Sequence, residues 1–122
     1  MKENSFNQDT PAFDAVLAQT IARHFRGATA EAIDGGQTVR LGDGLPVIEC
    51  FIDEIQDHKP YGAFVFLQIS GGAFGDRRVL VTASGYGSSQ LESVVAAGCN
   101  WACAFGPVLL TGIGRPELIN TE

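Results

Sequence analysis

Residues 79–105, VLVTASGYGSSQLESVVAAGCNWACAF, contain the clearest structural signal in the chain. Val79–Ala83 is rich in β-branched side chains and predicts a strand. Gly85-Tyr86-Gly87 interrupts this strand. The S-x-x-E spacing of Ser89–Glu92 is typical of a helix start, because the hydroxyl and the carboxylate can each accept a hydrogen bond from a free backbone N–H. From Leu91 to Phe105 apolar residues recur at helical spacing, so we expect a helix with one buried face.

Two residues of this expected helix bear on its packing. Gly98 has no side chain at the contact, and we expect it to bring the helix close to a sheet. Trp101 extends the buried face and is expected in the core with its indole N–H hydrogen-bonded. Residues 107–113 fit either a helical continuation after Pro107 or a further strand, and the sequence leaves both open.

The N-terminal part of the chain predicts a second helix. Thr10-Pro11 is typical of a cap followed by proline at the first helical position. Apolar residues at helical spacing continue to Phe25, and Gly27 is a natural stop. We therefore expect a helix over about Pro11–Arg26, preceded by frayed residues 1–9.

Short segments between the two helices predict strands. They lie at residues 29–33, 37–41, 45–55, 61–70 and 77–84, separated by glycine-rich or polar turns. In the third, Cys50 and Ile52 point to one side and Glu49, Phe51 and Asp53 to the other. The fourth is almost wholly apolar and is expected to be a central strand covered on both faces.

Connections this short favour an antiparallel meander, because parallel crossovers need more residues. The predicted fold class is therefore α+β, with an antiparallel sheet of about four or five strands packed against an N-terminal and a C-terminal helix. At 122 residues the chain has the length of one domain, with a second frayed segment expected at 114–122.

Composition and charge narrow the function classes. The formal net charge of −6 opposes contact with phosphate backbones and favours encounter with a basic protein. The longest apolar runs, at 64–69 and 102–113, are read as too short or too interrupted to span a membrane, and no export signal is visible. We expect a cytoplasmic protein that binds neither nucleic acid nor membrane, and homo-oligomerisation remains open.

The residues that could support catalysis or metal binding are few. Cys50, Cys99 and Cys103 are expected to be reduced, buried thiols, and the histidines are His24 and His58. Cys99 and Cys103 share a helix face, but a metal site would need two more ligands. We therefore expect no catalytic residues, metal or cofactor. The alternative is a small enzyme or ligand-binding domain that uses the Gly85–Ser89 turn with Cys99 or His58 nearby.

An acidic cluster with neighbouring aromatic residues is the candidate binding site. Carboxylates in a cleft can also serve acid–base catalysis, and charged turns are often only solvated. Aromatic side chains flanked by acids suit an interface with a basic protein. The candidate partner-binding residues are Glu49, Phe51, Asp53, Glu54, Asp57, Tyr61 and Tyr86.

Three short motifs resemble those of small bacterial immunity proteins, which neutralise toxins delivered between cells. They are Ala83-Ser84-Gly85-Tyr86-Gly87, Ser89–Glu92 and Asn100-Trp101, all in the C-terminal third. The resemblance implies a compact acidic α+β protein whose partner is a basic toxin domain; it assigns no binding residues. A structural or secretion-accessory domain that self-associates through a sheet edge is the remaining alternative.

Overall fold

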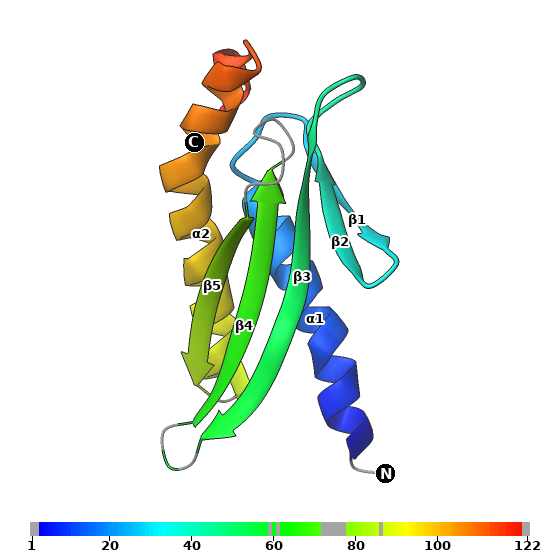
Figure 1. Cartoon of the computed structure of the whole chain (residues 1–122), viewed down its shortest axis with the longest axis vertical. Coiled ribbons are helices and arrows are strands. Elements are labelled where there is room, and N and C mark those ends of the chain that lie inside the picture. The colour runs from blue at the N-terminus through cyan, green and yellow to red at the C-terminus, as the bar shows by residue number, and fades with distance from the viewer. Residues whose placement is uncertain (1–2, 59, 61, 72–77, 86, 121–122) are drawn as a thin grey trace.

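The computed structural model describes residues 3–58, 60, 62–71, 78–85 and 87–120. Its elements follow one another as α1 (Glu3–Ala22), β1 (Thr29–Ile33), β2 (Gly36–Arg40), β3 (Val47–His58), β4 (Gly62–Gly71), β5 (Arg78–Gly85), α2 (Gly87–Gly112) and the 3-10 helix η2 (Pro116–Leu118). Each strand pairs antiparallel with the next, so the strand order in the sheet is the chain order. The predicted α+β class, an antiparallel meander with an N-terminal and a C-terminal helix, is confirmed (Figure 1).

Both long helices lie on one face of the sheet. Helix α1 packs against β1, β2 and β3, α2 packs against β4 and β5, and the helices contact each other. Figure 1 shows both helices behind the strands. The core between these layers contains fully buried apolar side chains from every layer, among them Leu17, Ile21, Val39, Ile48, Val65, Leu67, Ile69, Val94 and Leu110.

The opposite face of the sheet has no described helix over it. Val65, Leu67 and Ile69 point toward the helices and are fully buried, whereas the alternate residues Phe64 and Phe66 are only half-buried. The prediction that the fourth strand, β4, is covered on both faces is therefore wrong. Because α1 and α2 pack side by side, they cover the same face and leave the other open.

Gly98 lies at a close contact between the two helices. A Cβ atom at Gly98 would lie 3.1 Å from Cγ2 of Thr20 and 3.2 Å from Cδ1 of Leu17, both on α1. Gly98 thus brings α2 close to α1, and not to the sheet as the sequence predicted. At the start of α2, the side chain of Gln90 donates a 2.8 Å hydrogen bond to the carbonyl of Ala63 and links this helix to β4.

The helix boundaries differ from the predicted ones. Helix α1 begins at Glu3 instead of Pro11, because its polar first residues give no packing signal, and it ends at Ala22. Helix α2 begins at Gly87, before Ser89, and runs through Pro107 to Gly112, which settles the open alternative for residues 107–113. Pro107 is exposed, and so is Cys103, whose carbonyl loses its intrahelical partner there.

The C-terminal tail, expected to have no packing pattern, runs beside the chain that follows α1. The Arg26 N–H donates to the Leu118 carbonyl at 2.6 Å, and the Asn120 N–H donates to the His24 carbonyl at 2.8 Å. A bridge between Phe25 and Ile119 lies between these two bonds. These contacts give residues 24–26 partners outside the helix and explain why α1 stops before Arg26.

Candidate functional site

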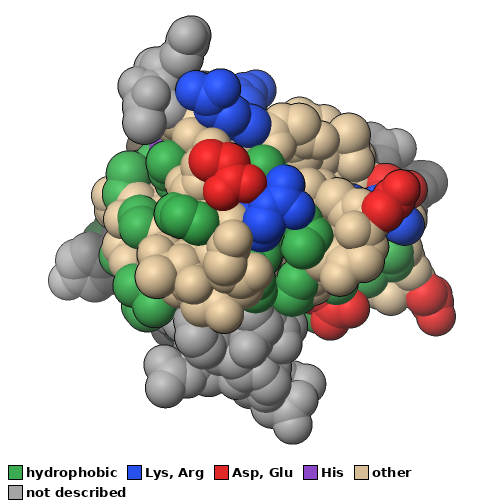
Figure 2. All heavy atoms as spheres, turned by 90° about the horizontal axis from the view of Figure 1, so that it is seen from above, with side chains coloured by type: hydrophobic (Ala, Val, Ile, Leu, Met, Phe, Trp, Pro, Cys, Tyr) green, Lys and Arg blue, Asp and Glu red, His purple; other side chains and the backbone are tan. Residues whose placement is uncertain are grey.

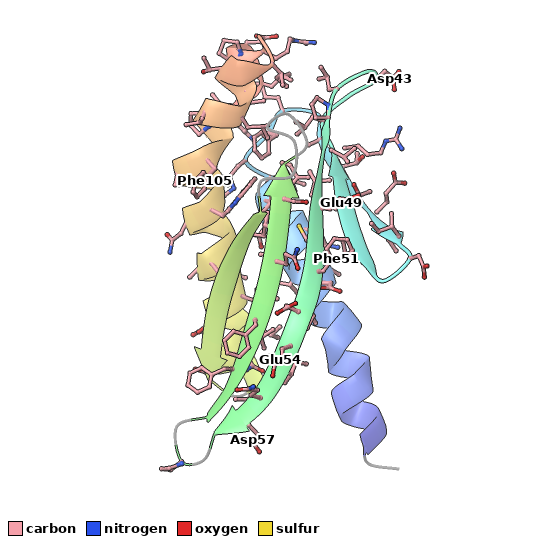
Figure 3. All side chains as sticks on the ribbon, viewed as in Figure 1. Asp43, Glu49, Phe51, Glu54, Asp57 and Phe105 are labelled. Atoms are coloured by element: carbon pink, nitrogen blue, oxygen red, sulfur yellow. The ribbon has the colours of Figure 1, made fainter. Side chains whose placement is uncertain are left out.

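The open face of the sheet carries most of the predicted site residues. We call it the outer face and define it by its described side chains on the two central strands: Glu49, Phe51, Asp53, Glu54 and Gln56 of β3, with Phe64, Phe66, Gln68 and Ser70 of β4. The cross-strand register places Phe51 opposite Gln68 and Glu54 opposite Phe66. Figure 3 shows Glu49, Phe51 and Glu54 following one another along β3.

A β-bulge brings two of the acids together on this face. The register of β3 on β4 shifts between Ile52, opposite Leu67, and Glu54, opposite Phe66. Ile52 faces the helices, and Glu54 pairs with the outward-facing Phe66. Asp53 is the extra residue between them, so the bulge places both carboxylates on the outer face. Asp53 and Glu54 are both exposed. With strict alternation of side chains along β3, only Asp53 would lie on the outer face.

Phe51 is fixed on the outer face by close contact with the backbone of β2. A Cβ atom at Gly36 would lie 2.9 Å from Cε1 of Phe51 and 2.5 Å from the carbonyl oxygen of Cys50. The ring therefore occupies the space beside a residue that has no side chain. Phe51 is half-buried, and it presents an apolar surface between Glu49 and the two acids of the bulge.

The described ion pairs lie away from Asp53 and Glu54. Arg40 is paired in register with Val47, where β3 begins, and makes a 3.2 Å ion pair with Glu31. Arg115, near the C-terminus, makes a 2.6 Å ion pair with Glu117. Figure 2 looks down on the end where β3 begins and shows Arg side chains among hydrophobic and acidic ones. Within the described side chains, Asp53 and Glu54 therefore have no basic residue in an ion pair with them.

Of the other three predicted binding residues, the structure describes only Asp57. Asp57, expected in a polar turn, lies within β3 opposite Ala63, which is buried on the helix side. Its register thus places Asp57 on the opposite face, at the end of the strand (Figure 3). Tyr61 and Tyr86 lie outside the described residues.

Asp14 is an acid that the sequence reading missed. It lies on α1, is only 6% exposed, and its Oδ1 has no hydrogen-bond partner among the described residues. Burial raises the pKa of Asp14 from 3.8 to about 7, and a hydrogen bond from the backbone of Ile52 opposes this rise. Asp14, Ala18 and Ile21 have the helical spacing of one buried face, which is the signal that identifies it.

Asp14 is expected to make the stability of the fold fall as pH rises. Because its folded pKa is raised above 3.8, the folded protein retains a proton that the unfolded chain releases. Its contribution is therefore complete below pH 3.8 and is lost as pH approaches about 7.

The substitution Asp14→Asn removes this titration. Relative to the native protein, we expect the variant to gain about 2 kcal/mol of unfolding free energy between about pH 5 and pH 8. Urea unfolding at both pH values gives the difference. A difference between the two proteins that does not change with pH would contradict the assignment.

The three cysteines differ in their exposure to solvent. Cys50 is fully buried; burial, then the charges of Asp14 and Glu49, raise the pKa of Cys50 to about 12, so it is a protonated thiol near neutral pH. Cys99 is half-buried and Cys103 is exposed, which corrects the expectation of three buried thiols. Within the described residues, no group of three or more His, Cys, Asp or Glu side chains could hold a metal ion.

His24 follows α1, and Trp101 lies on α2. His24 is half-buried just after α1, with Nδ1 3.1 Å from the Thr20 carbonyl oxygen. Trp101 is buried as predicted, but its indole N–H has no partner among the described residues. The ring of Trp101 contacts that of Phe105, which is 42% exposed, at a centroid separation of 5.8 Å.

Helix α2 is longer and more apolar than we expected from its apolar run at residues 102–113, which was read as too short or too interrupted to span a membrane. Its segment Ser89–Gly112 is, among the described residues, the one helix long and apolar enough to cross a membrane. The core helix of a soluble protein meets the same criteria. Here 44% of the segment's most apolar window is buried against the rest of the protein.

Comparison with known proteins adds no assignment to this geometry. No protein-family model, curated protein or solved structure matches the chain.

Proposed function

We propose that this protein is a non-enzymatic, cytoplasmic binding protein that inhibits a basic protein partner through its outer face. In its most specific form, the proposal is an immunity protein that neutralises a bacterial toxin by covering its basic active site. The resemblance of the C-terminal third to immunity proteins supports this class.

The observation that carries the proposal is the combination of aromatic and acidic side chains on the outer face. Phe51, Phe64 and Phe66 are half-buried there, with no described helix over them, while Asp53 and Glu54 are exposed beside them. Interfaces concentrate their binding energy in a few aromatic anchors, and surrounding charges select the partner and speed its approach. The outer face offers both features.

The formal net charge of −6 strengthens the electrostatic part of the proposal. A basic partner is attracted from a distance by the whole protein and oriented by the acids of the bulge. Contact then buries Phe51 and Phe66, whose rings are already held by the sheet and lose little conformational freedom. The pairing of β3 with β4 extends from Ile48 to His58 and holds these side chains in place before the partner arrives.

Site-specific photocrosslinking tests the proposal. A photoreactive phenylalanine analogue is placed at Phe66 on the outer face or, as a control, at Phe105 on α2, and each protein is irradiated in cells of its native host. We expect one basic protein to crosslink from position 66 and not from position 105. Crosslinks to the same protein from position 105 alone would contradict the proposed face.

A further inference from the structure

Most of the large apolar side chains that the structure describes as exposed lie on α2. They are Leu91, Val95, Phe105 and Val108, of which Val108 is 55% exposed, and Ile33 on β1 is the remaining one. Helix α2 contacts α1, β4, β5 and η2, and Figure 1 shows it along one side of the molecule. Exposed apolar side chains gathered on one element are typical of an interaction surface.

The middle of this exposed side of α2 consists of smaller side chains. Ala96, Cys99, Asn100 and Cys103 have the spacing i, i+3, i+4 and i+7, so they surround one point of the helix surface. Cys99 is half-buried and the other three are exposed. Because none of the four is large, a second helix can cross α2 closely at this point.

The exposed side of α2 is also uncharged, although the chain has a formal net charge of −6. No charged residue lies between Glu92 and Arg115, and this is the longest such run in the chain. Two copies of an acidic chain repel each other where their acids meet, and at α2 they can approach without that repulsion. Because α2 packs on the face of the sheet opposite the outer face, the acids of the two outer faces also stay far apart.

We propose that two copies of this chain associate through the exposed side of α2, with the helices antiparallel across a two-fold axis at the four smaller side chains. A two-fold contact joins a surface to itself. The Val95 end of one copy then meets the Val108 end of the other. The Asn100 amides, each both donor and acceptor, lie near the axis, where a polar side chain fixes the register of paired helices. Both outer faces remain open, so the proposal does not rest on the proposed function.

A lipid surface is the other occupant that an apolar helix face could meet, and the charges of the chain argue against it. Helices that lie on membranes carry Lys and Arg, which anionic lipids attract. Helix α2 has no basic residue in its last turn, and its one charged residue is Glu92. The net charge of −6 adds repulsion from an anionic membrane.

Sedimentation equilibrium of the isolated protein tests the association. One helix–helix contact is small for an obligate dimer, so we expect the native protein to change from monomer to dimer between about 1 and 100 µM. Ala96→Glu places like charges against each other across the axis and should weaken association at least about 10-fold. The control Ser89→Glu adds the same charge at an exposed position near the start of α2 and should dimerise like the native protein. A native protein that is monomeric at about 500 µM, or equal association of both variants, would overturn the proposal.

Thiol cross-linking identifies the surface in contact. Cys103 is exposed and Cys50 is buried, so a short bis-maleimide added to the Cys99→Ser variant reacts at Cys103. We expect covalent dimers from Cys103 and far fewer when Cys103→Ser and Ser89→Cys move the thiol to the start of α2. Equal yields from the two positions would contradict the proposed contact.

Flotation with vesicles of phosphatidylcholine and phosphatidylserine tests the lipid alternative. We expect the native protein to stay in solution. Recovery of the native protein with the vesicles, and not of Ala96→Glu, would overturn the assignment of this surface to a second copy.

Discussion

Replacing Asp53 and Glu54 together by lysine should slow association with the basic partner by about 10- to 100-fold at low salt. Both side chains are exposed on the outer face, and the bulge places them beside each other. The substitution therefore replaces attraction by repulsion at the point of contact. It should also flatten the dependence of the association rate on salt concentration, which stopped-flow or surface-binding kinetics measure directly.

A matched variant separates the effect of position from that of net charge. Asp34→Lys with Asp43→Lys raises the net charge of −6 by the same amount, and both residues are exposed in turns outside the strands of the sheet. We expect this control to slow association only a few-fold. If both double variants slow association equally, net charge alone steers the partner and the outer face has no special part.

The substitution Gly98→Leu should destabilise the fold by about 3 kcal/mol or more. Its first side-chain atom would meet Thr20 at 3.1 Å and Leu17 at 3.2 Å, and the remaining atoms would have to enter the contact between α1 and α2. Leu17 is fully buried and cannot move toward solvent. Chemical denaturation monitored by far-UV circular dichroism gives the loss.

Ala104→Leu is the control for this change. Ala104 is on the same helix and exposed, so a larger side chain meets water there, and the expected change is within about 0.5 kcal/mol. If Gly98→Leu is as stable as this control, the helices do not approach each other at Gly98 in solution.

Local patterns in the sequence were sufficient to predict the order and type of the elements, but not the geometry of the outer face. The alternation of Glu49 and Phe51 with Cys50 correctly indicated the face to which each points. No residue type marks the bulge at Asp53, and the resulting reversal also moves Asp57 to the other face. A bulge depends on how two strands pair, which a single strand's pattern does not contain.

The open face itself also escaped prediction, for a related reason. Phe64 and Phe66 make β4 read as apolar on both sides, whereas the packing of α1 against α2 leaves one side uncovered. That choice is set by contacts between distant segments, such as Gly98 against Thr20. Asp14 does not stand out in the sequence, because the helix is recognised by its apolar residues and Asp14 is not one of them.

The most direct test of the outer face combines the crosslink from Phe66 with the two double charge reversals. The photoreactive analogue at position 66 is introduced into the native protein, into Asp53→Lys/Glu54→Lys and into Asp34→Lys/Asp43→Lys, and the crosslinked partner is quantified in each. We predict that the crosslink persists in the native protein and in the Asp34→Lys/Asp43→Lys variant and is largely lost in the Asp53→Lys/Glu54→Lys variant. Equal crosslinking in all three proteins would contradict binding through the acids and aromatic side chains of this face.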